Sequence, residues 1–142
     1  MAQTWLLPID GSETALKAVD WVIVNATEFA APPVVHLLNV QPLLPADIGR
    51  FVNHEQIRAF HREQGEAALA PAVARMREGG IDAQPHVSVG DTAETICEFA
   101  STKACTQIVM GTHGRTGVIG VLLGSTTIKV AHQAGIPVLL IR

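Results

Sequence analysis

Residues 108–127 read IVMGTHGRTGVIGVLLGSTT, a stretch that contains three successive structural signals. An apolar run of strand length comes first, a glycine-rich stretch follows, and three hydroxyl residues then begin a helical pattern. Residues 5–12, WLLPIDGS, show the same order, with Asp10 and Gly11 as turn residues and Ser12 as a capping hydroxyl. Both stretches therefore predict a buried strand that leads through a turn into a helix.

The rest of the chain continues this alternation of strands and helices. Apolar or alternating runs predict strands at 5–9, 34–40, 83–89, 108–110 and 136–141. Periodicity of three and four residues, with capping and glycine signals, predicts helices at about 12–29, 54–78, 91–100 and 125–132. In the third strand Pro85, Val87 and Val89 alternate with polar residues, which predicts one buried face. Pro85 also places this strand at a sheet edge, since proline cannot donate a hydrogen bond to a neighbouring strand.

Strands that alternate with helices and are mostly apolar throughout favour a parallel α/β sheet with helices on both faces. Ligands of such sheets bind beyond the carboxyl ends of the strands, at the point where the strand order reverses. With the first strand central and the third at an edge, the reversal lies between the first and fourth strands. Asp10 and Gly111 follow those two strands. The sequence therefore predicts a ligand site between them.

Length and composition fit one globular domain over residues 1–142, of which 48% are hydrophobic and 16% charged. The sequence does not open with a basic segment followed by an apolar stretch, and no apolar run approaches a membrane span. We therefore expect a cytoplasmic protein with no membrane partner. Two cysteines, Cys97 and Cys105, and six scattered histidines do not have metal-ligand spacing, so no metal site formed by side chains is expected.

Charge is unevenly distributed along the chain. Residues 99–142 contain no Asp or Glu but hold Lys103, Arg115, Lys129 and Arg142. This asymmetry favours an anionic ligand near the C-terminal part of the chain. Four bases spread over so long a segment do not form the dense basic stripe of a nucleic-acid-binding surface, so nucleic acid is not expected as a partner.

The glycines between 111 and 124 suit phosphate binding. A helix N-terminus presents unpaired N–H groups, and glycines before it allow close approach of phosphate oxygens. Arg115 would add a charged fork and Ser125 a hydroxyl. Neither the P-loop spacing nor the dinucleotide fingerprint is present. Simpler interpretations stay open: a flexible surface connection for the loop, an Asx-turn for Asp10 and an ordinary N-cap for Ser125.

The spacing Gly111-x-x-Gly114, nine residues, then Gly124-Ser125 resembles the motif of the ATP-binding universal stress proteins. Further segments are similar to the same family in their order and separation: LLPIDGSE at 6–13, GDTAETI at 90–96, IVMGTHGRTG at 108–117 and IPVLLIR at 136–142. The resemblance thus extends over nearly the whole chain.

The resemblance implies a Rossmann-like fold of the adenine-nucleotide alpha-hydrolase type, with five parallel strands in the order 3-2-1-4-5. It also implies a homodimer that forms by antiparallel pairing of the last strand, Pro137–Ile141. The implied ligand is ATP, with Mg²⁺ held through the phosphates. The implied ligand-binding residues are Pro8, Ile9, Asp10, Val40, Met110, Gly111, Gly114, Arg115, Gly124, Ser125 and Thr126.

Three positions depart from the usual family pattern. Thr106 and Gln107 stand where an acid and an apolar residue are usual, which is expected to affect entry into the fourth strand more than ligand contact. Gly120 stands at a loop position that is often basic or polar in relatives. A glycine there would loosen the loop or weaken a phosphate contact.

The function favoured by these patterns is a regulatory ATP-binding dimer of the stress response, whose nucleotide-dependent state is read by an unidentified protein partner. No residue is a persuasive candidate for orienting water in ATP hydrolysis, so we predict no catalytic residue and at most slow hydrolysis or phosphate transfer to Ser125. The alternative is a universal stress protein that binds no nucleotide and acts as a dimeric interaction module. A phosphoacceptor receiver domain is disfavoured because Asp10 is followed by Gly11 and not by a second acid.

Overall fold

The computed structural model describes residues 2–112 and 123–142. Five parallel strands form one sheet in the order β3-β2-β1-β4-β5. The predicted order is confirmed, including the edge position of the strand that contains Pro85 and the reversal between β1 and β4. The strands are β1 (Thr4–Pro8), β2 (Val34–Gln41), β3 (Gln84–Val89), β4 (Gln107–Gly111) and β5 (Val138–Ile141).

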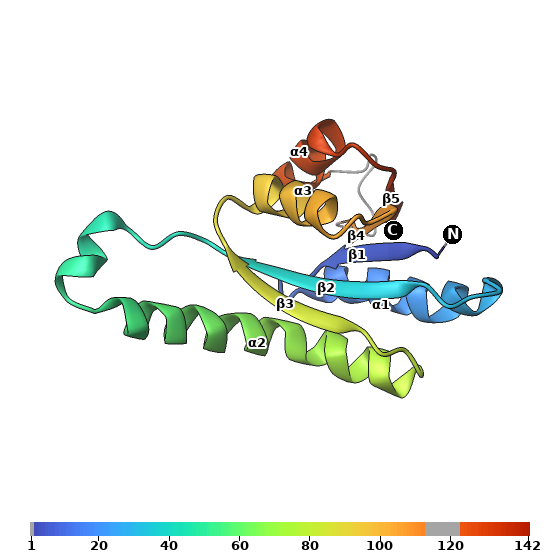
Figure 1. Ribbon diagram of the computed structural model, residues 1–142, viewed down its shortest axis with the longest axis horizontal. Helices are drawn as coiled ribbons and strands as arrows, with labels where there is room; N and C mark the ends of the chain where they lie inside the picture. Colours follow the sequence, from blue (N-terminus) through green and yellow to red (C-terminus); the bar gives the residue numbers. More distant parts are fainter. Residues whose placement is uncertain (1, 113–122) are drawn as a thin grey trace, which may run out of the picture.

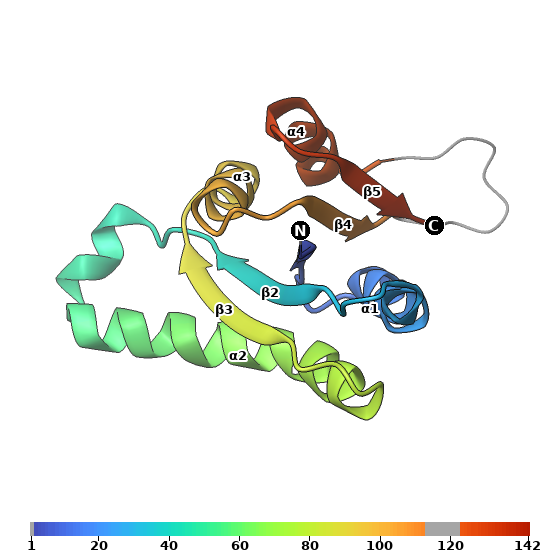
Figure 2. The same ribbon diagram turned by 45° about the vertical axis from the view of Figure 1, so that its right-hand side comes forward.

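Helices cover both faces of the sheet (Figure 1, Figure 2). One face carries α1 (Glu13–Asn25) and α2 (His54–Glu78). The other carries α3 (Thr92–Thr102) and α4 (Ser125–Gln133). Two short 3₁₀ segments, η1 (Ala26–Glu28) and η2 (Ala46–Arg50), follow α1 and β2. The first helix therefore ends before the predicted boundary near residue 29, because the chain winds more tightly in η1.

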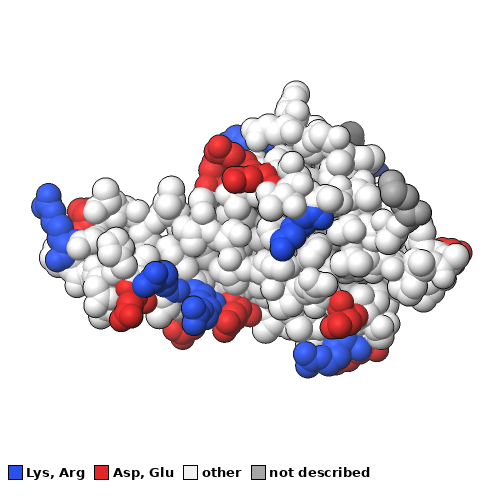
Figure 3. All heavy atoms as spheres, in the orientation of Figure 1, with Lys and Arg blue, Asp and Glu red and all other residues white. Residues whose placement is uncertain are grey.

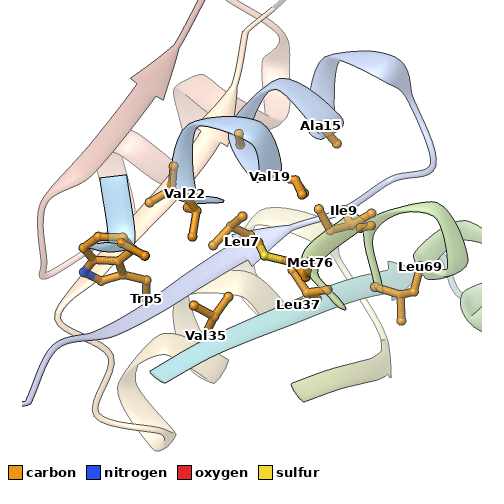
Figure 4. Close-up of a cluster of buried hydrophobic side chains, with 14 residues drawn as sticks. Trp5, Leu7, Ile9, Ala15, Val19, Val22, Val35, Leu37, Leu69 and Met76 are labelled. Atoms are coloured by element: carbon orange, nitrogen blue, oxygen red, sulfur yellow. The ribbon is translucent and has the colours of Figure 1, made fainter. Parts of the chain in front are cut away.

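Alternate residues of β1 pack on opposite faces of the sheet. Trp5 and Leu7 belong to the core under α1 and α2, whereas Leu6 belongs to the core under α3 and α4, and none of the three is more than 1% exposed. Figure 4 shows the first of these cores, in which side chains of α1 and α2 meet those of β1 and β2. A strand buried on both faces must be apolar at nearly every position, which explains the continuous apolar runs.

The predicted buried face of β3 is only partly present. Val87 packs against the core beneath α2, where a Cβ at Gly65 would lie 2.5 Å from its Cγ1. Pro85 is exposed and Val89 is 43% exposed, because an edge strand has a neighbour on one side only. His86, which alternation assigned to solvent, is half-buried on the opposite face.

Thr106 fastens the start of β4 to β1. Its backbone N–H donates to the carbonyl oxygen of Thr4 (2.7 Å), and its Oγ1 accepts from the Thr4 N–H (3.0 Å). The hydroxyl lies 3.0 Å from both the Thr4 carbonyl oxygen and Gln3 Oε1, to one of which it donates. The departure from the family pattern at Thr106 therefore lies at the entry of β4, where the residue is bonded to β1.

His36 of β2 and His86 of β3 form a pair beneath α3. His36 Nδ1 and His86 Nε2 are 2.9 Å apart, so one nitrogen donates and the other accepts. Phe99 covers both rings, with centroid distances of 5.7 Å and 4.9 Å. Burial and the nearby Lys103 ammonium lower the pKa of His36, and burial, His36 and Lys103 lower the pKa of His86. Both shifts favour the neutral form of the imidazole ring.

Stability should fall as the pH drops below about 6.5, the ordinary pKa of histidine. Both histidines have a lowered pKa in the folded state, so the unfolded chain binds protons that the folded chain does not, and acid favours unfolding. The thermal midpoint of the double variant His36→Gln/His86→Gln should depend less on pH between about pH 5 and about pH 8 than that of the wild type. His54→Gln, an exposed control, should follow the wild type. Parallel profiles for the wild type and the double variant would contradict this assignment.

Candidate functional site

An open cleft lies beyond the carboxyl ends of β1 and β4, where the strand order reverses. Its cavity volume is about 220 Å³, somewhat below the usual range of small-molecule and cofactor sites, and it is partly open to solvent. The first turns of α1, α3 and α4 line it through Thr14, Thr92 and Thr126 respectively. Helix N-termini carry partial positive charge, so their convergence suits an anionic ligand.

All implied ligand residues in the described part of the chain line this cleft: Pro8, Ile9, Asp10, Val40, Met110, Gly111, Gly124, Ser125 and Thr126. The fold thus brings together the ends of three strands and the start of α4. Gly114 and Arg115 fall outside the described residues, as does Gly120. Lining residues that were not predicted are Ser12, Thr14, Ala15, Leu38, Asn39, Thr92, Ile96 and Thr127.

Asp10 forms the turn between β1 and α1. Its Oδ1 accepts hydrogen bonds from the backbone N–H of Ser12 (2.9 Å) and from Ser12 Oγ (2.5 Å). Ser12 in turn caps α1 by accepting from the Ala15 N–H (3.2 Å). The Asx-turn interpretation of Asp10 is therefore confirmed. Its carboxylate is exposed at the cleft, so a ligand contact is compatible with this turn.

The start of α4 differs from the starts of α1 and α3. Ser12 and Asp91 cap those two helices, each by accepting a backbone N–H at 3.2 Å and 3.1 Å. At α4 the N-cap is Gly124, at φ −63° and ψ 155°, and among the described residues no side chain caps the helix. The prediction that Ser125 is the N-cap is therefore wrong, because the extended conformation falls on Gly124 and Ser125 is already helical. Within the described residues, the first N–H groups of α4 have no side-chain partner and can donate to water or a ligand.

Gly111 is required by packing at the floor of the cleft. A Cβ at this position would lie 1.9 Å from the carbonyl oxygen of Thr14, in the first turn of α1. The end of β4 and the start of α1 can approach so closely only because position 111 has no side chain. This contact explains the glycine independently of any ligand.

Asn39 fixes the chain after β1 and was not assigned a role from the sequence. It is 4% exposed, and its Nδ2 donates to the carbonyl oxygen of Ile9 (2.8 Å) while its Oδ1 accepts from Gln41 Nε2 (2.7 Å). The Ile9 N–H donates to the carbonyl oxygen of Leu38 (2.8 Å). The sequence feature that could have pointed to Asn39 is its polar side chain inside the apolar run 34–40.

Asn39→Ala should lower the free energy of unfolding by about 1–3 kcal/mol, because it leaves the buried Ile9 carbonyl without this donor. Gln41→Ala removes only the outer bond to Asn39 and should cost less. Urea denaturation of both variants measures the difference. Equal midpoints for Asn39→Ala and the wild type would show that the Asn39 contact does not stabilise this turn.

Among residues 2–112 and 123–142, no group of three or more His, Cys, Asp or Glu side chains is placed to hold a metal ion. Burial raises the pKa of the Cys97 and Cys105 thiols, which disfavours their thiolate forms. In the same part of the chain, no helix combines the length and the apolar character needed to span a bilayer.

Comparison with known proteins gives matches over the whole chain. Universal stress protein MJ0531 of Methanocaldococcus jannaschii is 34% identical over 140 residues, covering 96% of this chain and 80% of that protein. The solved structure of protein MJ0577, from the same organism, superimposes with a TM-score of 0.77 at 26% identity, over 99% of this chain and 96% of that one. A universal stress protein solved in complex with cAMP gives a TM-score of 0.67 at 25% identity, over 99% and 96% of the two chains.

The model of the universal stress protein family matches residues 1–142. The match covers the glycine segment of the sequence, and the solved relatives share the arrangement of the sheet. The family match over the whole chain and the 34% identity to MJ0531 show that the chain belongs to the universal stress protein family.

Proposed function

We propose that this universal stress protein binds ATP and acts as a regulatory nucleotide-binding protein in the stress response. The observation that carries the proposal is the start of α4, which opens into the cleft with Gly124 as its N-cap and, in the described chain, no capping side chain. Free N–H groups at the positive end of a helix bind phosphate. The solved relative in complex with cAMP supports an adenine nucleotide as the ligand class.

The lining of the cleft fits the two ends of such a ligand. Pro8, Val40 and Met110 offer apolar surface for an adenine ring, and the segment 124–126 offers backbone and hydroxyl donors for phosphates. Asp10 is the single carboxylate among the described lining residues. Mg²⁺ would therefore be held mainly through the phosphates, because one carboxylate does not complete the oxygen shell of this ion.

The cleft favours binding over rapid turnover. ATP hydrolysis requires a group that orients water and groups that stabilise charge on the γ-phosphate. Asp10 is engaged with Ser12 in its turn and lies beside the proposed adenosine position. We therefore propose at most slow hydrolysis or phosphate transfer to Ser125, and sustained turnover above about 1 s⁻¹ would contradict this.

MgATP should stabilise nucleotide-free protein in a thermal unfolding series. At about a hundred times its dissociation constant, a ligand adds about 2.7 kcal/mol, which raises the midpoint of a domain of this size by roughly 8–12 °C. MgGTP should give a smaller shift, and cAMP shows whether the triphosphate is needed. The absence of a shift with all three nucleotides would favour the alternative function, a dimeric interaction module without nucleotide.

We further propose that two copies pair through Pro137–Ile141, that the dimer acts in the cytoplasm, and that a protein partner recognises its nucleotide-dependent surface. Support comes from β5, which is an edge strand with four half-buried residues and a strand neighbour on one side only in the described chain. An edge of this kind is a template for pairing with a second copy. Sedimentation that finds only monomer would contradict the dimer.

A further inference from the structure

The connection between β2 and α2 and the first half of α2 extend beyond the sheet (Figure 1). We call residues 42–63 the arm. A hydrogen bond joins the two ends of the arm. Buried His61 donates through Nε2 to the carbonyl oxygen of Pro42 (3.2 Å). Asn53 and Gln56 form a reciprocal capping box at the start of α2 (2.8 Å and 2.9 Å). A surface that is pre-organised by its own hydrogen bonds loses little conformational freedom when it binds a partner.

The arm carries an apolar groove that the proposed function does not use. Two aromatic side chains of the arm are exposed: Phe60, which lines the groove, is 45% exposed, and Phe51, which precedes the lining residue Val52 in the sequence, is 84% exposed. Leu43, at the base of the arm, is 74% exposed. Exposed apolar clusters with aromatic anchors are typical of protein contacts. The groove is lined by Leu44, Ile48, Val52, Gln56, Ile57 and Phe60.

The charges of the arm indicate which partner fits. All its arginines and acids are exposed, and they are balanced in number: Arg50, Arg58 and Arg62 against Asp47, Glu55 and Glu63. Figure 3 shows both signs interspersed along this part of the molecule, with uncharged surface between them. An acidic or a basic partner would meet as many like charges as opposite ones. In a two-fold contact with a second copy, the arginines of one arm can lie opposite the acids of the other arm, around the same apolar groove.

We propose that the arm is a self-association surface, on which the groove of one copy packs against the arm of a second copy. The contact is separate from the proposed pairing of β5. The arm leaves the sheet from β2, next to the edge strand β3, whereas β5 forms the other edge. Figure 2 shows the arm and β5 on opposite sides of the molecule. The two contacts can therefore form together, and each can fail without the other.

Sedimentation of the full chain tests the arm contact. The double variant Phe51→Asp/Phe60→Asp introduces carboxylates at the exposed anchors, and Val24→Asp places the same chemistry at a 70% exposed position of α1. The arm variant should sediment with at most half the mass of the wild type, with a dissociation constant raised at least about thirty-fold. Val24→Asp should match the wild type. Equal masses for the wild type and the arm variant would overturn the proposal, whether both are monomers or both are dimers paired through β5.

A cross-linking experiment keeps the proposal testable if the charged variant is poorly folded. In a two-fold contact, position 60 lies against the partner's arm, so Phe60→Cys should give a covalent dimer with a bismaleimide long enough to join cysteines on two facing arms. Val24→Cys is the matched control and should not cross-link above the wild-type background. That background comes from Cys97, which is half-buried, and Cys105, which is buried. Equal cross-linking at positions 60 and 24 would also overturn the arm contact.

Discussion

Gly111→Ala is expected to lower the free energy of unfolding by more than about 3 kcal/mol, a large part of the roughly 5–15 kcal/mol that stabilises a native domain. The new Cβ would lie 1.9 Å from the Thr14 carbonyl oxygen, and the next nearest atom is the Thr14 carbonyl carbon at 2.8 Å. Both are backbone atoms in the first turn of α1, so they cannot rotate away as a side chain would. The end of β4 or the whole of α1 must move instead. Urea denaturation followed by circular dichroism measures this loss.

Two other glycines provide a graded control for this experiment. A Cβ at Gly135 meets nothing within 4 Å, so Gly135→Ala should leave the urea midpoint close to that of the wild type. A Cβ at Gly65 meets the methyl groups of Val87 at 2.5 Å and 2.6 Å, which can partly yield, so Gly65→Ala should lie between the two. If Gly111→Ala unfolded at the same urea concentration as Gly135→Ala, the close approach of β4 to α1 would not be a feature of the folded protein.

The sheet could be predicted because its signals are local and repeated. Apolar runs followed by turn residues marked β1 and β4, and Pro85 marked the edge strand. The face of His86 could not be predicted, because alternation on an edge strand gives no information about which helix lies above it. His86 meets Phe99 of α3, a contact that depends on the tertiary packing of a later segment.

The position of the cleft could be predicted from the sequence, but the structural roles of several residues that line it could not. The glycine motif located Gly111, whereas Asn39 was assigned no role from the sequence. Both residues act through backbone contacts with distant segments. The clash partner of Gly111 is Thr14, and the partner of Asn39 is Ile9 across the β1–β2 pair. Such contacts follow from register and helix placement, which residue type does not encode. The N-cap of α4 was misplaced by one residue for a related reason: backbone conformation, and not the preference for a hydroxyl, put it at Gly124.

Because Gly111→Ala is expected to destabilise the fold, the phosphate contact has to be tested at a position where stability and binding separate. Gly124 is such a position. Its φ of −63° and ψ of 155° are open to any residue, and it precedes N–H groups that no side chain in the described chain caps. Gly124→Asp places a carboxylate where an N-cap side chain accepts those hydrogen bonds. The substitution should leave the urea midpoint unchanged or raise it slightly, since an acid also suits the positive end of a helix.

The same substitution should weaken MgATP binding at least about a hundred-fold, because the carboxylate takes the donors and repels the phosphate charge. Gly124→Asn caps the helix without the charge, so its affinity should lie between those of the wild type and Gly124→Asp. Adenosine, which has no phosphate, should bind all three proteins equally if the base sits over Pro8 and Val40. Calorimetry with both ligands therefore separates the two halves of the proposed site. Equal MgATP affinity in the wild type and Gly124→Asp would mean that the phosphates do not lie at the start of α4, whatever else the cleft binds.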